Sequence, residues 1–328
     1  YLAVVEAANG RVDDALARLD RIESTRRATD EVSPTEHYTL LNTHARVLDA
    51  AGRPEDSLPL HVAAAEAAAD ALGPHHPATA DMRENVATTH WTLGHRRTAL
   101  DVLREALEDT REPRPPTDAR RRCTQAARLR EVGRMQDAEH VLQPLLASDD
   151  ALAAVGTPCL VIAGVGLAVA GRLPQAERVR QVVLAREPAL GPQLRYWLDL
   201  VAALQLEPRD LQAAAASLSQ LTEVGRWLFA EQPTLTYWAA SLWARNRWRA
   251  EDCPAAEPVA QSVLPAEPGP LDLSQIRCAH VLARCRAAAG DPEGAARWEA
   301  VTTSGLAGLE VAWAPAQDPL GPWLEPAG

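Results

Sequence analysis

The stretch LGPHHPATADMRENVATTHWTLGHRRTALDVLREAL, residues 72–107, carries the pattern that decides the fold of this chain. Two helix-forming segments flank a turn glycine, Gly94, and a small residue, Ala99, follows five positions later. Glycine lets a chain reverse between two helices, because it adopts positive φ without a Cβ clash. The small residue lies where the second helix presses closest on the first. The stretch therefore predicts a helical hairpin.

The same turn and the same small residue recur along the chain at intervals of 38 to 42 residues. The turn positions are Gly10, Gly52, Gly94, Gly133, Gly171, Arg209, Glu251 and Gly290, and the small residues are Ala15, Ser57, Ala99, Ala138, Ala176, Ala214, Ala256 and Ala295. A fixed period of roughly 34 to 47 residues is typical of stacked helical hairpins. The sequence predicts an all-α, right-handed α-solenoid of about eight hairpins, the first of them truncated at Tyr1.

The pattern divides the chain into four parts. N-terminal repeats occupy residues 1–110, and a proline-rich hinge, REPRPPTD, occupies residues 111–118, because its three prolines cannot continue a helix. Degenerate repeats follow at 119–307, and residues 308–328 form a tail rich in proline and tryptophan. Since the first hairpin is cut at Tyr1, we expect further sequence upstream.

The tail has two expected roles. Its four prolines favour extended structure, and Trp313 and Trp323 are large anchors. The last hairpin of a solenoid has an apolar face that must be covered. We expect the tail to cover that face or to lie back in the groove of the solenoid as an internal ligand, and disorder is the alternative.

Charge and composition narrow the classes of partner. The net charge is −11, whereas a nucleic-acid binder needs a basic surface to neutralise phosphates. All 33 basic residues are arginine, a bias typical of a GC-rich bacterial genome. The 47% hydrophobic content consists mostly of Ala, Leu and Val, which favours close helix packing over sheet. We predict a cytoplasmic bacterial protein that binds no nucleic acid.

The five cysteines show no spacing typical of a disulfide framework. An odd count without such spacing predicts reduced thiols in a cytosolic protein. Cys278 and Cys285 are seven residues apart and would share a helix face. Either both side chains pack in the core or the two thiols form a redox pair.

One uncharged segment, residues 151–171, approaches the length of a bilayer span. It is only weakly apolar, since it is rich in Ala and Gly and is broken by Thr157 and Pro158. The repeat explains it as a helix that Pro158 opens and Gly171 closes. We therefore expect a buried helix and no membrane partner.

Residues 72–107 resemble the tetratricopeptide repeat of the kinesin-light-chain type. The matching residues are Leu72, Gly73, His76, Pro77, Thr79, Asn85, Ala87, Gly94, Ala99 and Leu103. Members of this family are protein-interaction modules in which the first helix of each hairpin lines a concave groove. Related repeats in bacteria often accompany nucleotide-binding or regulatory domains, so the resemblance is compatible with fusion to, or action with, a signalling domain upstream of Tyr1.

The resemblance implies that four positions of each first helix face the groove, at 13, 10, 6 and 3 residues before the turn. The partner-binding candidates at or beside these positions are Asn42, Arg46, Asn85, Thr88, Trp91, Arg120, Arg130, Tyr196, Trp238, Arg245, Trp248, Arg277 and Arg284. Groove asparagines in related modules bond to the backbone of an extended peptide, because an amide both donates and accepts. Cys123, Val161 and Asp199 replace that amide in other repeats, which indicates a more particular ligand.

Two features of the sequence allow a binding role or a packing role. Residues 111–134 hold eight arginines against three acids, which suits a carboxylate or phosphate partner, or a solvated face paired with neighbouring acids. Trp238 and Trp248 fall on the groove side next to Arg245, the composition of a binding hot spot. The alternative is that these tryptophans only cover the end of the stack.

Catalytic signatures are missing from the sequence. A P-loop motif needs lysine, and the pair Gly164-x-Gly166 does not have the dinucleotide spacing. Neither H-E-x-x-H nor G-x-S-x-G occurs. We predict no catalytic residue, no cofactor and no metal site, and hence a non-catalytic scaffold, adaptor or regulatory sensor arm that holds a protein or peptide in its groove. The alternatives are a self-associating structural repeat protein and a small-molecule-sensing helical-repeat protein.

Overall fold

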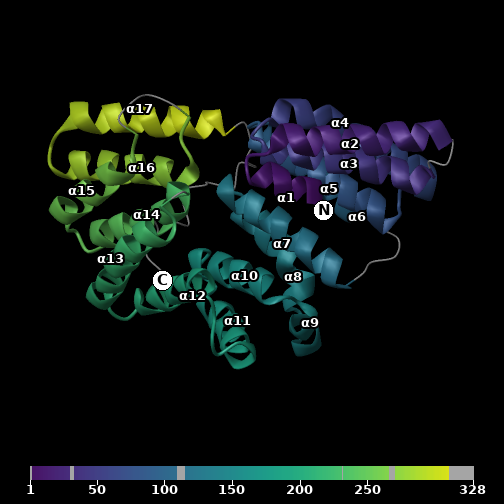
Figure 1. Cartoon of the computed structure of the whole chain (residues 1–328). Coiled ribbons are helices and arrows are strands. Elements are labelled where there is room, and N and C mark those ends of the chain that lie inside the picture. Colours follow the sequence, from purple (N-terminus) through teal and green to yellow (C-terminus); the bar gives the residue numbers. More distant parts are fainter. Residues whose placement is uncertain (1, 30–32, 109–114, 231, 266–269, 310–328) are drawn as a thin grey trace. The chain divides into compact units, whose positions relative to one another are not determined.

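The computed structural model describes residues 2–29, 33–108, 115–230, 232–265 and 270–309, and all the regular structure within these ranges is helical (Figure 1). The helices are α1 (Leu2–Ala8), α2 (Val12–Thr29), α3 (Pro34–Ala50), α4 (Pro54–Leu72), α5 (Pro77–Thr92), α6 (Arg96–Glu108), α7 (Pro115–Glu131), α8 (Met135–Leu146), α9 (Asp149–Ala154), α10 (Thr157–Val169), α11 (Leu173–Arg186), α12 (Pro192–Leu206), α13 (Leu211–Leu228), α14 (Pro233–Arg249), α15 (Cys253–Val263), α16 (Leu273–Ala288) and α17 (Pro292–Gly308). The predicted all-α fold is confirmed.

The chain forms two compact units, residues 1–121 and residues 122–328. The first unit contains the hairpins α1–α2, α3–α4 and α5–α6 together with the start of α7. The second unit contains the rest of α7, which leads into α8, followed by the hairpins α10–α11, α12–α13, α14–α15 and α16–α17. Each predicted turn position lies between two helices, so the eight predicted hairpins are present.

Backbone geometry explains why glycine marks most of the turns. The six turn glycines have φ between 71° and 82°, a region that side chains with a Cβ rarely adopt. Glu251 takes the same left-handed conformation at the seventh turn, with φ 60°. The turn at Arg209 closes differently, because the amides of Arg209 and Asp210 both donate to the carbonyl of Leu206. The period therefore persists where glycine is absent.

The small residues after the turns lie where the helices approach most closely. Seven of the eight, from Ala15 to Ala256, are at most 2% exposed. Ser57 additionally donates a hydrogen bond to Asp49, whose carboxylate also lies 2.8 Å from Nε2 of the buried His61. These contacts join α3 to α4 across the turn at Gly52.

Helix packing follows one rule inside each unit. In the first unit α3 packs on α4, α4 packs on α5, and α1 packs directly on α3. In the second unit α10 packs on α11 and α11 packs on α12, while the first helices also touch directly, α10 with α12 and α14 with α16. In these three pairs the first helices of consecutive hairpins lie side by side, and a hydrogen bond from Asn85 to Asn42 also links α5 to α3. This layer of first helices is the one that the sequence predicted for a groove.

Helix starts agree with the capping residues in the sequence. Ser33 and Glu36 cap α3 reciprocally, side chain to backbone in both directions, and Asp272 and Gln275 cap α16 in the same way. Proline stands in the first turn of many of the helices, where its missing amide hydrogen costs no hydrogen bond.

The uncharged segment at 151–171 forms α9 and α10, and α10 is buried along most of its length, as expected. The short α9 was not expected. Within the described ranges, none of the helices combines the length and the hydrophobicity that a bilayer span requires.

The proposed hinge and tail fall partly or wholly outside the described residues. Residues 115–118 form the first turn of α7, and the remainder of the hinge, residues 111–114, lies outside the described ranges. Gly308 ends α17, Leu309 follows it, and the rest of the tail, residues 310–328, also lies outside those ranges. The hinge and both roles of the tail stay predictions.

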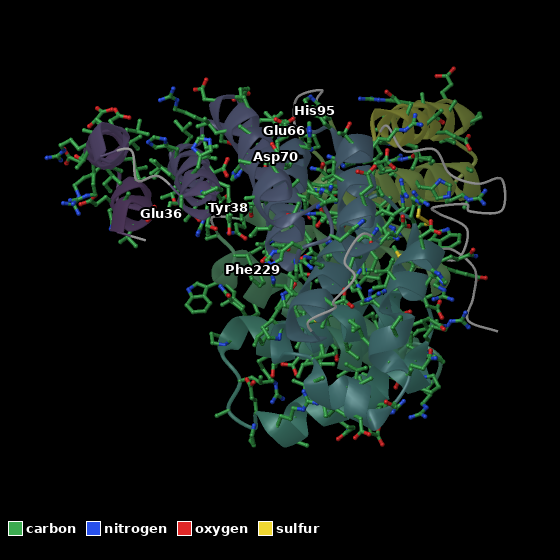
Figure 2. The ribbon with its side chains drawn as sticks, turned by 90° about the vertical axis from the view of Figure 1, so that its right-hand side faces the viewer. Glu36, Tyr38, Glu66, Asp70, His95 and Phe229 are labelled. Carbon is green, nitrogen blue, oxygen red and sulfur yellow. A yellow bond between two sulfur atoms is a disulfide. The ribbon has the colours of Figure 1, made fainter. Side chains whose placement is uncertain are left out.

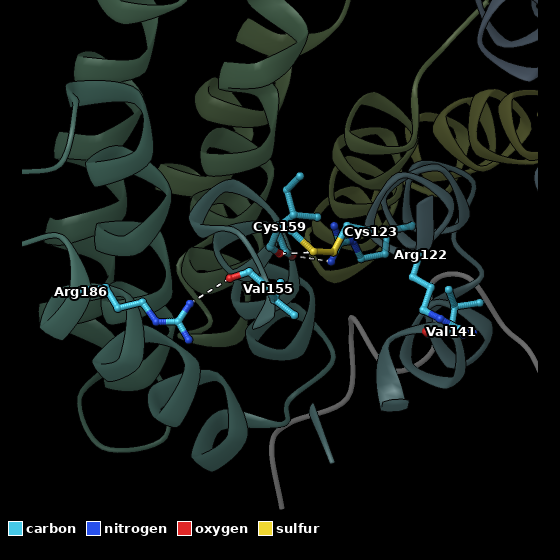
Figure 3. The surroundings of a disulfide bond; sticks show 8 residues. Arg122, Cys123, Val141, Val155, Cys159 and Arg186 are labelled. Atoms are coloured by element: carbon cyan, nitrogen blue, oxygen red, sulfur yellow. Dashed lines mark hydrogen bonds between the residues drawn. A yellow bond between two sulfur atoms is a disulfide. The ribbon is translucent and has the colours of Figure 1, made fainter. Parts of the chain in front are cut away.

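The expectation of reduced thiols is wrong for four of the five cysteines. Cys123 on α7 and Cys159 on α10 form a disulfide with a Cα–Cα distance of 5.6 Å (Figure 3). Cys253 on α15 and Cys285 on α16 form a second disulfide, with a Cα–Cα distance of 5.3 Å. Cys278 is a free, buried thiol, so core packing explains it. Both bonds connect consecutive hairpins, whose proximity the spacing of the cysteines alone did not indicate.

Candidate functional site

The predicted partner-binding residues differ widely in exposure. The exposed candidates are Arg46, Thr88, Arg120 and Arg284; the half-buried ones are Asn42, Asn85, Trp91, Trp238 and Trp248; the buried ones are Arg130, Tyr196, Arg245 and Arg277. Partner contacts of all thirteen stay predictions. The four buried side chains lie inside the fold, where packing and ion pairs engage them, as set out below.

The two groove asparagines bond to each other. Nδ2 of Asn85 on α5 donates to Oδ1 of Asn42 on α3 at 2.9 Å. The first helices of consecutive hairpins are thus linked by the amides that were expected to bond to the backbone of a peptide. A peptide could use only the remaining donor and acceptor positions of this pair.

An acid–arginine network lies at the start of α7, on the side of α5. Arg120 donates to Glu84 at 3.0 Å, and the adjacent Arg121 donates to Asp81 at 2.7 Å and to the carbonyl of Pro77 at 2.9 Å. Burial raises the pKa of the Glu84 carboxyl above its usual value, although both arginines oppose this increase. Arg120 is exposed and Arg121 is buried, so only Arg120 can also reach a partner.

The other described arginines of the basic segment also have partners within the protein. Arg128 pairs with Glu131, Arg134 pairs with Asp137, and Arg122 donates to the carbonyl of Val141. Pairing with neighbouring groups, one of the two explanations allowed by the sequence, therefore describes this segment. Exposed pairs of this kind contribute about 0–1 kcal/mol each.

Arg130 occupies a space that a glycine leaves open. Its Nη1 donates to the carbonyl of Ile162 on α10 at 2.7 Å. A Cβ on Gly166, one turn further along α10, would lie 1.8 Å from this Nη1 and 2.8 Å from Cζ. Burial lowers the pKa of Arg130 to about 10, so the group remains charged at neutral pH. Gly166 thus admits a buried cation between the first helices α7 and α10.

Replacing Gly166 by alanine is expected to destabilise the protein by about 2 kcal/mol, because overpacking typically costs about 1–3 kcal/mol and here also displaces a buried charge. Gly164→Ala is the matched control, since the nearest atom to its Cβ would be Cγ1 of Val179, at the ordinary contact distance of 3.4 Å. The control should gain up to about 1 kcal/mol from helix propensity. Urea unfolding followed by circular dichroism measures both, and equal midpoints would contradict the assignment.

Tyr196 belongs to an aromatic cluster in the second unit. Its ring meets Trp197 at 5.0 Å and Phe229 at 5.1 Å between centroids, edge to face in both cases. A Cβ on Gly225 would lie 2.9 Å from the Tyr196 hydroxyl, so α13 approaches α12 closely here. Burial raises the pKa of the Tyr196 hydroxyl. The residue therefore packs α12 against α13.

Three arginines gather on the first helices α14 and α16, and we call Arg245, Arg249 and Arg277 the arginine cluster. Arg245 and Arg249 on α14 both donate to Oε2 of Glu207, the residue that follows α12. The distance from Nη1 of Arg249 to this oxygen is 3.3 Å. Arg277 on α16 is 1% exposed, and its Cζ lies 5.8 Å from the ring centroid of Trp238 on α14. The cluster belongs to two consecutive hairpins, and the carboxylate of Glu207 belongs to the hairpin before them.

The positive charge of Arg245 lowers the pKa of its two neighbours in the cluster, whose side chains have little contact with solvent. Burial, and to a smaller extent the nearby Arg245, lower the pKa of Arg277 to about 9, and Asp272 partly opposes this. Burial and Arg245 likewise lower the pKa of Arg249, against the influence of Glu207. Arg277, with a pKa of about 9, remains charged at neutral pH, and it lies beside two further arginines in an acidic protein.

Several residues of these sites were not among the candidates. Arg121, Arg249 and Glu207 lie one to four positions from predicted groove residues, and helical periodicity alone does not show which of two adjacent side chains turns inward. Trp227 on α13 is 79% exposed, which no residue pattern signalled. Trp248 is half-buried, because part of its side chain packs against the hydrophobic core formed by α14, α15 and α16.

Depressions among the described residues include one in each unit. One of about 220 Å³ lies against Phe229, Thr236 and Tyr237, and it is smaller than the roughly 300–1,000 Å³ of typical ligand pockets. The other, of about 640 Å³, lies between α3 and α4, where Glu66 and Asp70 stand one turn apart (Figure 2). The alternative of a small-molecule-sensing protein stays a prediction.

The hairpins and the layer of first helices define a class, the helical-hairpin repeat proteins. Residues 36–112 match the tetratricopeptide repeat family model, so this part of the chain carries tetratricopeptide repeats. The kinesin-light-chain subtype and the bacterial source stay predictions. No curated protein matches the sequence.

Solved structures share the fold at low sequence identity. A tetratricopeptide repeat protein from Parabacteroides merdae is 15% identical, with a TM-score of 0.53, over 84% of this chain and 99% of that one. The quorum sensor NprR from B. thuringiensis, in its apo form, is 14% identical with a TM-score of 0.55 and coverages of 93% and 87%. The human IFIT1 dimer with PPP-AAAA is 16% identical with a TM-score of 0.52 and coverages of 92% and 67%.

Proposed function

We propose that this protein is a non-catalytic scaffold or regulatory sensor arm that holds a protein or peptide segment against its layer of first helices. The observation that supports the proposal is the direct packing of first helices on one another in the pairs α1–α3, α10–α12 and α14–α16, as a shared groove of first helices requires. Arg46 and Thr88 in the first unit, and Arg284 in the second, are exposed there. Such mixed polar surfaces with a few aromatic anchors suit peptide recognition.

The similar proteins support a sensing role more than a nucleic-acid role. NprR is a quorum sensor, and IFIT1 was solved with PPP-AAAA. The net charge of −11 opposes binding of a polyanion, and the arginines of the basic segment pair within the protein. We therefore infer a protein or peptide partner.

A matched pair of double variants tests the proposal. Arg46→Glu/Thr88→Glu changes the first helices α3 and α5, whereas Arg97→Glu/Thr98→Glu makes the same two substitutions at exposed positions of the second helix α6. Affinity capture from a lysate of the source cells should lose a specific partner with the first variant and retain it with the second. Equal capture by both variants would refute a binding surface on the first helices of this unit.

Self-association is the second candidate, and Trp227 favours it. This side chain is 79% exposed, and Val224, one turn away on α13, is 42% exposed. Exposed apolar patches often mark interfaces. Trp227→Ser should then convert an oligomer into a monomer in light scattering after size exclusion. A wild-type protein that is monomeric at high concentration removes this candidate.

The cytoplasmic location stays a prediction, and the two disulfides are an observation against it. Disulfides persist mainly in oxidising compartments, and four of the five cysteines here are paired. The two disulfides therefore weigh against a reducing cytoplasm. Thiol counting on protein isolated rapidly from its source under acid quench distinguishes the two locations.

A further inference from the structure

One turn of the first unit carries two histidines whose rings meet. His90 lies in the last turn of α5, and His95 directly follows the turn glycine Gly94. The Nδ1 atoms of the two histidines are 3.2 Å apart, and their ring centroids are 5.5 Å apart. His90 is half-buried and His95 is exposed. The two Nδ1 atoms therefore approach a common position that solvent can reach.

The backbone of this turn brings the two rings together. The amide of His95 donates to the carbonyl of His90 at 2.9 Å. The amide of Gly94 donates to the carbonyl of Trp91 at 3.0 Å, and Gly94 has φ 81°. These two bonds form a Schellman motif, in which the side chains at the two ends of the longer bond commonly touch. The contact between the imidazoles thus follows from the geometry of the turn.

Equivalent turns show what this pair of positions does in other hairpins. The same bond, from an amide to the carbonyl five residues earlier, closes the last two turns of the second unit. There the two positions carry opposite charges and form ion pairs, Arg247 with Asp252 at 3.5 Å and Arg286 with Asp291 at 3.8 Å. Two histidines cannot form such a pair, because both side chains are bases. A cation held between them would supply the opposite charge.

The two rings are suited to a metal ion. Neutral imidazole nitrogen binds divalent zinc, nickel and copper. Burial and, to a smaller extent, the neighbouring His95 lower the pKa of His90, so the ring of His90 is neutral at neutral pH. Two Zn–N bonds of about 2.0–2.1 Å, drawn from nitrogen atoms 3.2 Å apart, meet at about 100–105°, which is close to tetrahedral. One ion can therefore bond to both rings at their present separation.

We propose that His90 and His95 form a binding site for a divalent transition metal ion of the zinc type at the turn between α5 and α6. Within the described ranges, no group of three or more His, Cys, Asp or Glu side chains is placed to hold a metal ion, so this site supplies two protein ligands. Water fills the remaining positions, and the ion exchanges more readily than in a structural zinc site with four protein ligands. Sequence spacing alone predicted no metal site, because it does not show that the turn brings these rings together.

Isothermal titration calorimetry with ZnCl2 tests the site on the full chain after treatment with EDTA. The wild type should bind Zn²⁺, and His90→Gln and His95→Gln should each weaken this binding by about tenfold or more. Loss of an outer partner of a metal ligand alone typically costs about 10–100-fold, and here a ligand itself is lost. His140→Gln, at an exposed position of α8, is the matched control and should keep the wild-type affinity. MgCl2 should not bind to the pair, since Mg²⁺ prefers oxygen ligands.

Thermal unfolding gives a second readout. ZnCl2 should raise the Tm of the wild type and of His140→Gln, because the ion binds the folded state, in which the turn holds both rings together. It should leave the Tm of His90→Gln/His95→Gln unchanged. Circular dichroism without metal establishes that each variant is folded. If the double variant does not fold, His95→Gln alone decides the question, because His95 is exposed.

Two results would overturn the proposed metal site. One is equal affinity of the wild type and the folded histidine variants for ZnCl2, and the other is a wild type that binds no Zn²⁺. The proposed function has a separate readout in the capture experiment, because neither Arg46 nor Thr88 belongs to the histidine pair. Loss of the metal site with retained partner capture would therefore refute only the metal site.

Discussion

Removing either disulfide is expected to lower the free energy of unfolding of the second unit by about 3–4 kcal/mol, since each bond closes a loop of more than 30 residues in the unfolded chain. Cys123–Cys159 joins α7 to α10, and Cys253–Cys285 joins α15 to α16. Repeat proteins are held by contacts between neighbouring hairpins. A cross-link between neighbours therefore stabilises the interface on which the array depends.

Urea unfolding of oxidised and reduced protein measures this effect. The paired variants Cys123→Ser/Cys159→Ser and Cys253→Ser/Cys285→Ser should each lose part of the sensitivity to reductant, and Cys278→Ala should keep all of it. Burial raises the pKa of the Cys278 thiol, which keeps it unreactive in the folded state. Protein denatured without reductant should expose one thiol, that of Cys278, and five reactive thiols would contradict both bonds.

Glu207→Ala is expected to destabilise the second unit by about 3–5 kcal/mol, because it leaves Arg245 and Arg249 buried without the carboxylate that they share. The side chains of Glu207 and Arg245 are only 8% and 5% exposed. Solvent therefore cannot replace the lost partner. The cost should appear in thermal and urea unfolding alike.

Glu223→Ala is the matched control, because Glu223 pairs with Arg226 on the exposed face of α13. Its loss should cost at most about 1 kcal/mol. If the two glutamate variants unfolded at the same urea concentration, the ion pairs of the arginine cluster would not be buried as described.

The helices and turns could be predicted because their causes are local. A left-handed turn needs glycine or tolerates a residue such as Glu251, and the closest helix contact needs a small side chain such as Ala99. Both requirements act within a few residues and repeat with the period. A short added helix, α9, has no such periodic signal and was missed.

The chemistry of the site could not be predicted to the same extent, because it depends on contacts between hairpins. Arg120 and Arg121 are adjacent in sequence, yet one is exposed and the other is buried against α5. Asn42 and Asn85 were recognised as amides on first helices, but their mutual hydrogen bond depends on how α3 and α5 pack. The repeat period in the sequence shows which helices form a common surface. It does not show which side chains on that surface contact one another.

The disulfides illustrate the same limit. Cys123 and Cys159 stand 10 and 12 residues before their turns, at nearly equivalent positions of consecutive first helices. Once the direct packing of first helices is known, these similar positions predict that the two cysteines lie close together. Cys253 and Cys285 lie on a second and a first helix, and no equivalence of position marks them.

The cross-links also determine how the second unit responds to a pulling force. In an array held by neighbour contacts, tension applied at the ends peels hairpins away one at a time. Once the contacts around Cys253 and Cys285 give way, the covalent bond carries the load and the 31 residues between them are spared from stretching. Each bond thus shortens the contour length released on extension, and reducing agents would restore it.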